Sequence, residues 1–174
     1  MDAGRQNRKS EGSGMDLPDM RSQILAVPLI QSLPEGMRNR LGMILLWIAE
    51  PRELAAGETL FAEGAQDTNQ GCLLISGKAE IEKEASRLTT VEAPVLLGEL
   101  QQFTADEVRT ATVRIVEAGL VLFFDWPTLA DMAARVFSPT ETGKLKDSLA
   151  EFAADRFESL SDLLSIKHTE ESLE

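Results

Sequence analysis

The sequence predicts an α+β fold, mainly β, in which a barrel of roughly eight short strands is flanked by helices before and after it in the chain. Two observations support this class. Between Pro51 and Asp125 the apolar residues form short runs separated by glycines, as in antiparallel β domains. Outside that region they recur every three or four residues, which indicates amphipathic helices. With 174 residues, 43% of them hydrophobic, the chain has enough apolar material for one core.

The first fifty residues divide into a tail and a helical region. Residues 1–16 are rich in Gly, Ser, Arg and Lys and hold almost no large apolar side chain, so we expect a disordered tail. In residues 17–50 the apolar positions follow helical spacing, and Pro34 is a typical helix-start residue. We therefore expect two short N-terminal helices.

Residues 51–125 are expected to form the barrel. Residues 78–83 alternate polar and apolar side chains, as a half-exposed strand does. The other strand candidates are residues 59–61, 71–75, 86–91, 95–97, 110–116 and 120–124. Their spacing is that of a β-sandwich or barrel.

Residues 126–167 are expected to form two C-terminal helices, followed by a flexible tail at 168–174. Asp125 is a candidate N-cap with Pro127 in the first turn, and the second helix is expected to start at Thr140. An apolar stripe runs along this last helix, and such a stripe normally packs on the rest of the protein. Its members are Leu145, Leu149, Phe152, Ala153, Phe157, Leu160 and Leu164.

Composition excludes several classes of function. The net charge of −12 opposes a polyanionic nucleic acid. No apolar run approaches the roughly 20 residues of a transmembrane helix, so we expect no transmembrane segment. The single Cys72 cannot form an intramolecular disulfide, which favours the cytoplasm. His168 lies in a polar segment, and no nucleophile, base and orienting group can be assembled, so we expect neither a metal site nor an enzyme.

The most informative motif combines LGEL at residues 97–100 with RTATV at 109–113. Gly98 lets backbone N–H groups approach an anion because it has no Cβ. The carboxylate of Glu99 suits a pair of hydroxyl groups, and the guanidinium of Arg109 suits a phosphate. Together these residues predict a small pocket for a sugar phosphate.

This order of elements and motifs resembles the cyclic nucleotide-binding domain of catabolite-activator-type regulators and kinase regulatory subunits. The resemblance covers about residues 27–165. It includes AGETLFAEG at 56–64, similar to the family's entry into the barrel, and LLISGKAEI at 73–81, similar to its next hairpin. The resemblance implies an eight-stranded β-roll or jelly-roll barrel and a phosphate-binding cassette at residues 97–112, in which a short helix presents N–H groups to the cyclic phosphate.

The resemblance also implies roles for individual residues. Glu99 matches the carboxylate that accepts from the ribose 2′-hydroxyl, and Arg109 matches the arginine that holds the phosphate. Thr110 matches a hydroxyl position that reaches the phosphate or a purine edge. The expected ligand-binding residues are Gly98, Glu99, Leu100, Arg109, Thr110 and Ala111, with Val95, Leu96 and Leu73 as apolar walls.

Several residues depart from the family pattern. Gln101 stands where the family has a small residue, and Val108 replaces a proline. Asp106 and Glu107 bring negative charge close to an anion site. Glu99 and Arg109 therefore also allow a second interpretation, in which they pair with each other in an empty pocket.

Two functions remain open at this point. The first is a non-catalytic regulatory module for cAMP, cGMP or a relative that signals through its C-terminal helices to a protein partner or a second copy, with no cofactor. It would act in signal transduction without a DNA-binding domain, because the helices after Asp125 leave no room for a winged helix. The alternative is an adaptor with the same fold and a degenerate, ligand-free pocket that uses the apolar stripe of residues 145–164.

Overall fold

The N-terminal region forms three helices in the computed structural model, which describes residues 14–66, 69–102 and 108–172. They are α1 (Leu17–Ala26), α2 (Pro28–Gln31) and α3 (Glu35–Ile48). The Asp16 side chain caps α1 by accepting from the N–H of Asp19 at 2.9 Å. The expected first helix is split because Pro28 disfavours helical backbone at Val27 and starts a new helix at its own position.

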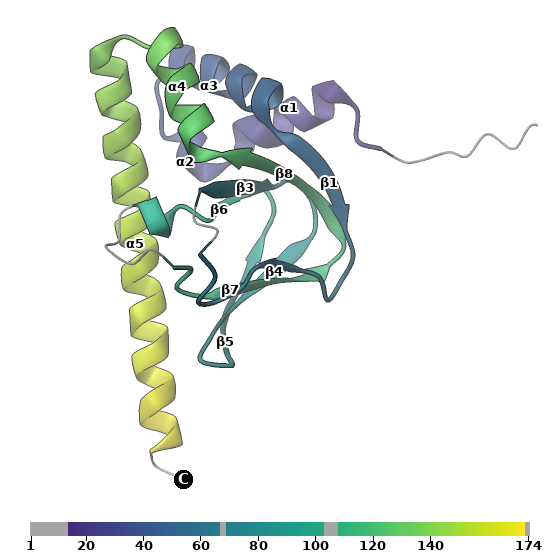
Figure 1. The fold of residues 1–174 in the computed structure, drawn as a ribbon, viewed down its shortest axis with the longest axis vertical. Helices are drawn as coiled ribbons and strands as arrows, with labels where there is room; N and C mark the ends of the chain where they lie inside the picture. Colours follow the sequence, from purple (N-terminus) through teal and green to yellow (C-terminus); the bar gives the residue numbers. More distant parts are fainter. Residues whose placement is uncertain (1–13, 67–68, 103–107, 173–174) are drawn as a thin grey trace, which may run out of the picture.

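The barrel consists of two four-stranded antiparallel sheets with the orders β1-β8-β3-β6 and β2-β7-β4-β5, which confirms the predicted fold (Figure 1). Helices hold more residues than strands because one helix, α5, spans 33 residues. The strands are β1 (Glu50–Leu54), β2 (Thr59–Phe61), β3 (Gln70–Leu74), β4 (Lys78–Lys83), β5 (Ser86–Glu92), β6 (Val95–Leu97), β7 (Thr112–Glu117) and β8 (Gly119–Asp125).

Strand β1 was missing from the strands predicted by apolar pattern. Its sequence, EPREL, has no alternation of apolar and polar residues, and its side chains are mostly exposed. It lies at the edge of its sheet and pairs only with β8. An edge strand tolerates Pro51 because the missing N–H group is not needed by a second neighbour.

Strands β3, β6 and β8 of the first sheet are covered on both faces. On β3, Cys72 and Leu74 face the second sheet, whereas Leu73 faces the helices. On β8, Val121 and Phe123 likewise face the barrel interior, and Leu122 between them faces the helices. Strands covered on both faces carry continuous apolar runs, so the sequence alone did not show which residue points to which side.

Two glycines allow the turn after β3 to approach the start of β8. A Cβ on Gly119 would lie 1.9 Å from the carbonyl oxygen of Ser76, and one on Gly77 would lie 2.4 Å from that of Glu117. Gly77 also adopts a φ of +88°, which L side chains rarely reach. The β3–β4 turn and the β7–β8 turn are therefore locked together at one end of the barrel.

The C-terminal helices are α4 (Trp126–Val136) and α5 (Pro139–Glu171). Asp125 caps α4 as predicted, accepting from the N–H of Thr128 at 3.2 Å. A capping box formed by Ser138 and Glu141 begins α5. Glu141 also accepts from the Nη1 of Arg40 on α3 at 3.1 Å. These hydrogen bonds lower the pKa of Glu141 to about 2 and tie the start of α5 to the N-terminal helices.

Helix α5 extends along one side of the barrel toward the C-terminus (Figure 1). The expected flexible tail from residue 168 is wrong for residues 168–171, because the helix continues to Glu171. Near its end, Lys167 donates to the carbonyl oxygen of Arg87 on β5. This contact explains how a polar segment remains against the barrel.

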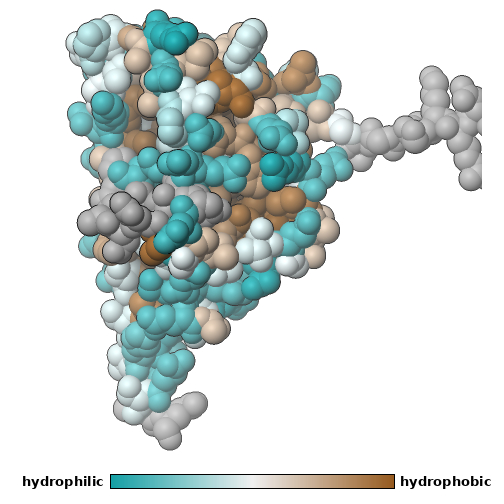
Figure 2. All heavy atoms as spheres, viewed as in Figure 1, coloured by the Kyte–Doolittle hydropathy of each residue, from teal (hydrophilic) through white to brown (hydrophobic). Residues whose placement is uncertain are grey.

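Only part of the predicted apolar stripe of α5 is covered. Ala153 is buried, whereas 53% of Phe157 is exposed. In Figure 2, hydrophilic atoms dominate the lower part of α5, and hydrophobic atoms gather where the N-terminal helices meet the barrel. None of the described helices has the length and apolarity needed to span a membrane.

Candidate functional site

The backbone after β6 turns sharply at Gly98. This residue has a φ of +87°, and a Cβ there would meet the ring of Phe61 at 3.0 Å and the Nη1 atom of Arg109 at 3.1 Å. Both the conformation and the space require a glycine. The turn is followed by the single-turn helix η1 (Leu100–Gln102), whose last N–H donates to the carbonyl oxygen of Glu99 at 3.1 Å.

The Arg109 guanidinium lies inside the barrel, with 2% of the residue exposed. Its Nη2 atom donates to the carbonyl oxygen of Gln70 at 2.6 Å, and Nη1 donates to that of Gly98 at 3.4 Å. Its carbon Cζ lies 3.9 Å from the centre of the Phe61 ring, a cation–π distance. The guanidinium is therefore held in place before any ligand arrives.

The carboxylate of Glu99 is fully buried and forms an ion pair with Arg156 of α5. Its Oε1 atom accepts from Arg156 Nη1 at 2.7 Å, and the same Nη1 donates to the carbonyl oxygen of Leu96 at 2.6 Å. Glu99 Oε2 has no hydrogen-bond partner among the described residues. Burial raises the pKa of Glu99, and the positive charges of Arg156 and Arg109 oppose that rise. The ion pair seen for Glu99 thus involves a helix far away in sequence rather than Arg109.

The same burial affects Cys72 on the neighbouring strand. Burial raises the pKa of its thiol, and the nearby Glu99 carboxylate adds to the rise. A buried thiol with a raised pKa is a poor nucleophile, and Cys72 instead packs in the barrel core.

Gly98, Glu99 and Arg109 line a cavity of about 40 Å³, here called the barrel pocket. Its wall includes the cassette residues, Phe61 of β2, and Arg156 and Leu160 of α5. Ligand pockets usually measure roughly 300–1,000 Å³, so this one has no room for a mononucleotide. Helix α5 closes it, because Arg156 and Leu160 supply one side of the wall.

Six of the predicted site residues line the barrel pocket together. They are Gly98, Glu99, Leu100, Arg109, Thr110 and Ala111. The carbonyl oxygen of Thr110 accepts from Lys83 Nζ at 2.8 Å, which fixes this segment against β4. Residues separated by the η1 segment in sequence are therefore neighbours around one cavity.

The predicted apolar walls need correction. Val95 is buried in the barrel core but does not line the pocket. Leu73 and Leu96 pair across β3 and β6 and share one face of the sheet, which points to the helices. Because strand side chains alternate, Leu97 on the opposite face lines the barrel pocket instead.

Sequence reasoning missed Arg156. Its signal was present, because Arg156 lies four residues after Phe152 and four before Leu160, within the apolar stripe of α5. A charged side chain on the apolar face of a packed helix is buried, and a buried charge requires an oppositely charged or hydrogen-bonding partner.

Three residues that depart from the family pattern are not fully described by the structure. Asp106 and Glu107 lie outside the described residues, and so does the side chain of Gln101, although the backbone of Gln101 belongs to η1.

Comparisons with known proteins agree with the architecture. Residues 51–136 match the family model of the cyclic nucleotide-binding domain. Among similar solved structures is PKAR CBD2 with bound Sp-2Cl-cAMPS, at 18% identity and a TM-score of 0.64, covering 84% of this chain and 92% of that chain. No curated protein sequence matches the chain.

Two further structures come from bacteria. The catabolite activator protein of Thermus thermophilus is 19% identical with a TM-score of 0.59, covering 79% of this chain and 63% of that chain. The c-di-GMP-responsive global regulator CLP of Xanthomonas campestris is 15% identical with a TM-score of 0.58, covering 70% of this chain and 60% of that chain. This chain thus spans less than two thirds of either regulator, and such identities show a shared fold.

Proposed function

We propose, on the premise that residues 51–136 belong to the cyclic nucleotide-binding domain family, that the chain is a non-catalytic receptor for a cyclic mononucleotide, cAMP or cGMP. The observation that carries this proposal is the gathering of Gly98, Glu99 and Arg109 around one pocket. A buried guanidinium suits a cyclic phosphate, and the unpaired Oε2 of Glu99 suits a ribose hydroxyl. The similar PKAR CBD2 structure holds a cAMP analogue, which supports the same ligand class.

Helix α5 is the proposed output of the receptor. Arg156 occupies the carboxylate that the ribose would use, and the closed barrel pocket measures about 40 Å³. A nucleotide therefore competes with Arg156, and its binding favours conformations in which α5 has left the pocket. We expect the released face of α5 to act on a protein partner or on a second copy of the chain in signal transduction, in the cytoplasm.

Isothermal titration calorimetry with cAMP and cGMP tests the receptor function. We expect one site per chain, and an at least tenfold weaker affinity for Arg109→Lys, because lysine keeps the charge but lacks the planar pair of donors. The matched control is Arg114→Lys on β7, which pairs with Glu82 and does not line the pocket. Absence of heat with either nucleotide at millimolar concentration refutes the proposal.

The second candidate function is an adaptor whose pocket stays empty. It is favoured by the small volume of the barrel pocket and by the Arg156–Glu99 ion pair, which already satisfies one carboxylate oxygen. Thermal unfolding with and without nucleotide separates the two functions. A ligand that binds only the native chain raises its melting temperature, whereas an adaptor melts at the same temperature under both conditions.

A further inference from the structure

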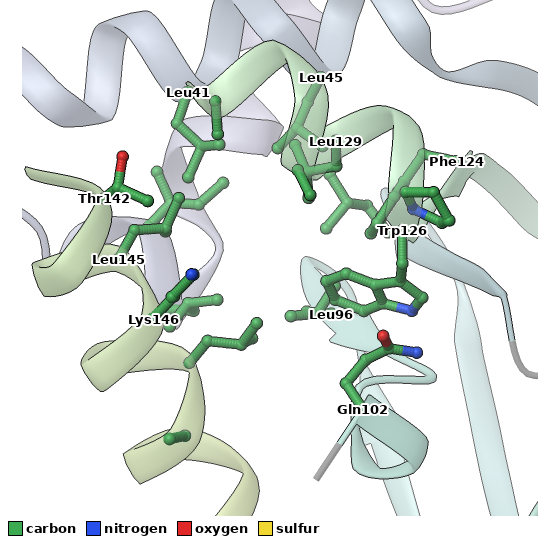
Figure 3. A pocket seen from close by; sticks show the side chains of 18 of the residues that line it. Leu41, Leu45, Leu96, Gln102, Phe124, Trp126, Leu129, Thr142, Leu145 and Lys146 are labelled. Carbon is green, nitrogen blue, oxygen red and sulfur yellow. The ribbon is translucent and has the colours of Figure 1, made fainter. Parts of the chain in front are cut away.

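A second and larger cavity lies on the other side of the first sheet. It measures about 630 Å³ and is lined by α2, α3, α4 and α5 together with the outward face of β3, β6 and β8. Figure 3 shows side chains from these elements pointing into a common hollow. We call it the interhelical cavity. Its volume lies within the roughly 300–1,000 Å³ that is typical of small-molecule sites.

The wall of the interhelical cavity is almost entirely apolar. Leu41 and Leu45 of α3 and Leu145 of α5 line the hollow, and the Trp126 indole lies across it from Leu145 (Figure 3). The indole N–H is turned away from the cavity to the carbonyl oxygen of Gly98, at 3.3 Å. An apolar hollow of this kind offers little to water and favours a hydrocarbon occupant. Leu73, Leu96 and Leu149 extend the apolar surface.

Polar side chains line the cavity at two places, namely Asn69 and Gln102 near the sheet and Thr142, Lys146 and Asp147 on α5. Thr142 and Lys146 lie one turn apart on that helix, and Figure 3 shows the Lys146 amine at the edge of the hollow. Lys146 forms no ion pair among the described residues, and both it and its neighbour Asp147, which also lines the cavity, are exposed. An apolar volume with a cation at its edge fits an amphiphile that has an alkyl chain and an anionic head.

We propose that the interhelical cavity binds a fatty acid, with the alkyl chain among the leucines and the carboxylate at Lys146. A nucleotide does not fit this chemistry, because the wall lacks the cluster of donors that a phosphate requires. The site is separate from the barrel pocket and does not depend on the function proposed for it. Leu73 and Leu96, predicted to line a nucleotide site, belong to the fatty-acid site instead.

Calorimetric titration of the full chain with dodecanoate tests the proposal. We expect one molecule bound per chain, and weaker binding by Ala150→Phe, because Ala150 lines the hollow and a phenyl ring there takes up part of the space of the alkyl chain. The matched control is Ala154→Phe, one turn further along α5 at an exposed position outside the cavity wall. Circular dichroism of each variant verifies that it is folded. Absence of binding by the wild type, or equal binding by both variants, overturns the proposal.

The role of Lys146 is tested with a second ligand. Lys146→Ala is expected to weaken dodecanoate binding about threefold to fivefold, as for an ion pair near the surface, and to leave dodecan-1-ol binding unchanged. The control is Lys144→Ala, which removes an equal charge from an exposed position of the same helix outside the cavity wall. An equal loss for acid and alcohol, or for both lysine variants, refutes the carboxylate head group.

Discussion

The barrel pocket and the interhelical cavity lie on opposite faces of the same sheet and differ in size and chemistry. The first holds about 40 Å³ among buried charges, and the second about 630 Å³ among leucines. A buried carboxylate is costly without a partner, so the protein closes the barrel pocket with its own Arg156. The apolar lining of the interhelical cavity makes no such demand. The two faces of one sheet therefore differ because one of them holds buried charge that must be paired.

The two sites are nevertheless connected. Trp126 lines the interhelical cavity with its ring and donates from its indole N–H to Gly98 in the cassette. Helix α5 borders the interhelical cavity through Leu145 and Leu149 and the barrel pocket through Arg156 and Leu160. A movement of α5 therefore changes the walls of both sites.

The largest predicted difference between the two faces comes from neighbouring leucines on β3. Leu74→Ala is expected to cost about 4 kcal/mol, because it opens a cavity in the closed barrel core. Leu73→Ala is expected to cost about 2 kcal/mol, because Leu73 already borders a hollow and has fewer packing partners to lose. Urea unfolding of both variants measures these losses. An equal or larger loss for Leu73→Ala contradicts the described cavity.

The next effect concerns the charge that closes the barrel pocket. Arg156→Ala is expected to cost about 3 kcal/mol at neutral pH, because it leaves the Glu99 carboxylate buried without its partner. Adding Glu99→Gln is expected to recover part of the loss. The control is Arg135→Ala, an exposed position on α4. Equal melting of Arg156→Ala and this control contradicts the closure of the pocket by the ion pair.

The loss in Arg156→Ala also depends on pH. The folded-state pKa of Glu99 is raised, so protonation of Glu99 favours the folded chain. The stability that this protonation contributes is fully present below the ordinary carboxyl pKa and is lost as pH rises through the raised folded-state value. A neutral Glu99 no longer needs Arg156, and we expect the loss in Arg156→Ala to shrink as the pH is lowered. Melting curves from pH 8 to pH 4 measure this trend, and a loss independent of pH contradicts it.

Sequence reasoning located the barrel pocket more reliably than its walls. Gly98, Glu99 and Arg109 could be assigned to the pocket because their chemistry is distinctive. Gly98 has no Cβ, the Glu99 carboxylate suits hydroxyl groups and the Arg109 guanidinium suits a phosphate. The faces of Leu73 and Leu96 were predicted wrongly, since a continuous apolar run carries no information about alternation. The place of Arg156 in the apolar stripe indicates a buried charge, but its pairing with Glu99, 57 residues away, depends on how α5 lies on the barrel, and no local pattern encodes that.

We propose that nucleotide binding and the packing of α5 against the barrel pocket are mutually exclusive. It can be tested by measuring the distance between spin labels at Glu53→Cys on β1 and Glu158→Cys on α5, both exposed positions. The native Cys72 does not take up label readily, because it is buried and its pKa is raised. With saturating cAMP or cGMP, whichever calorimetry shows to bind, we expect the distance distribution to shift to longer values. An unchanged distribution in a chain with bound nucleotide would contradict it.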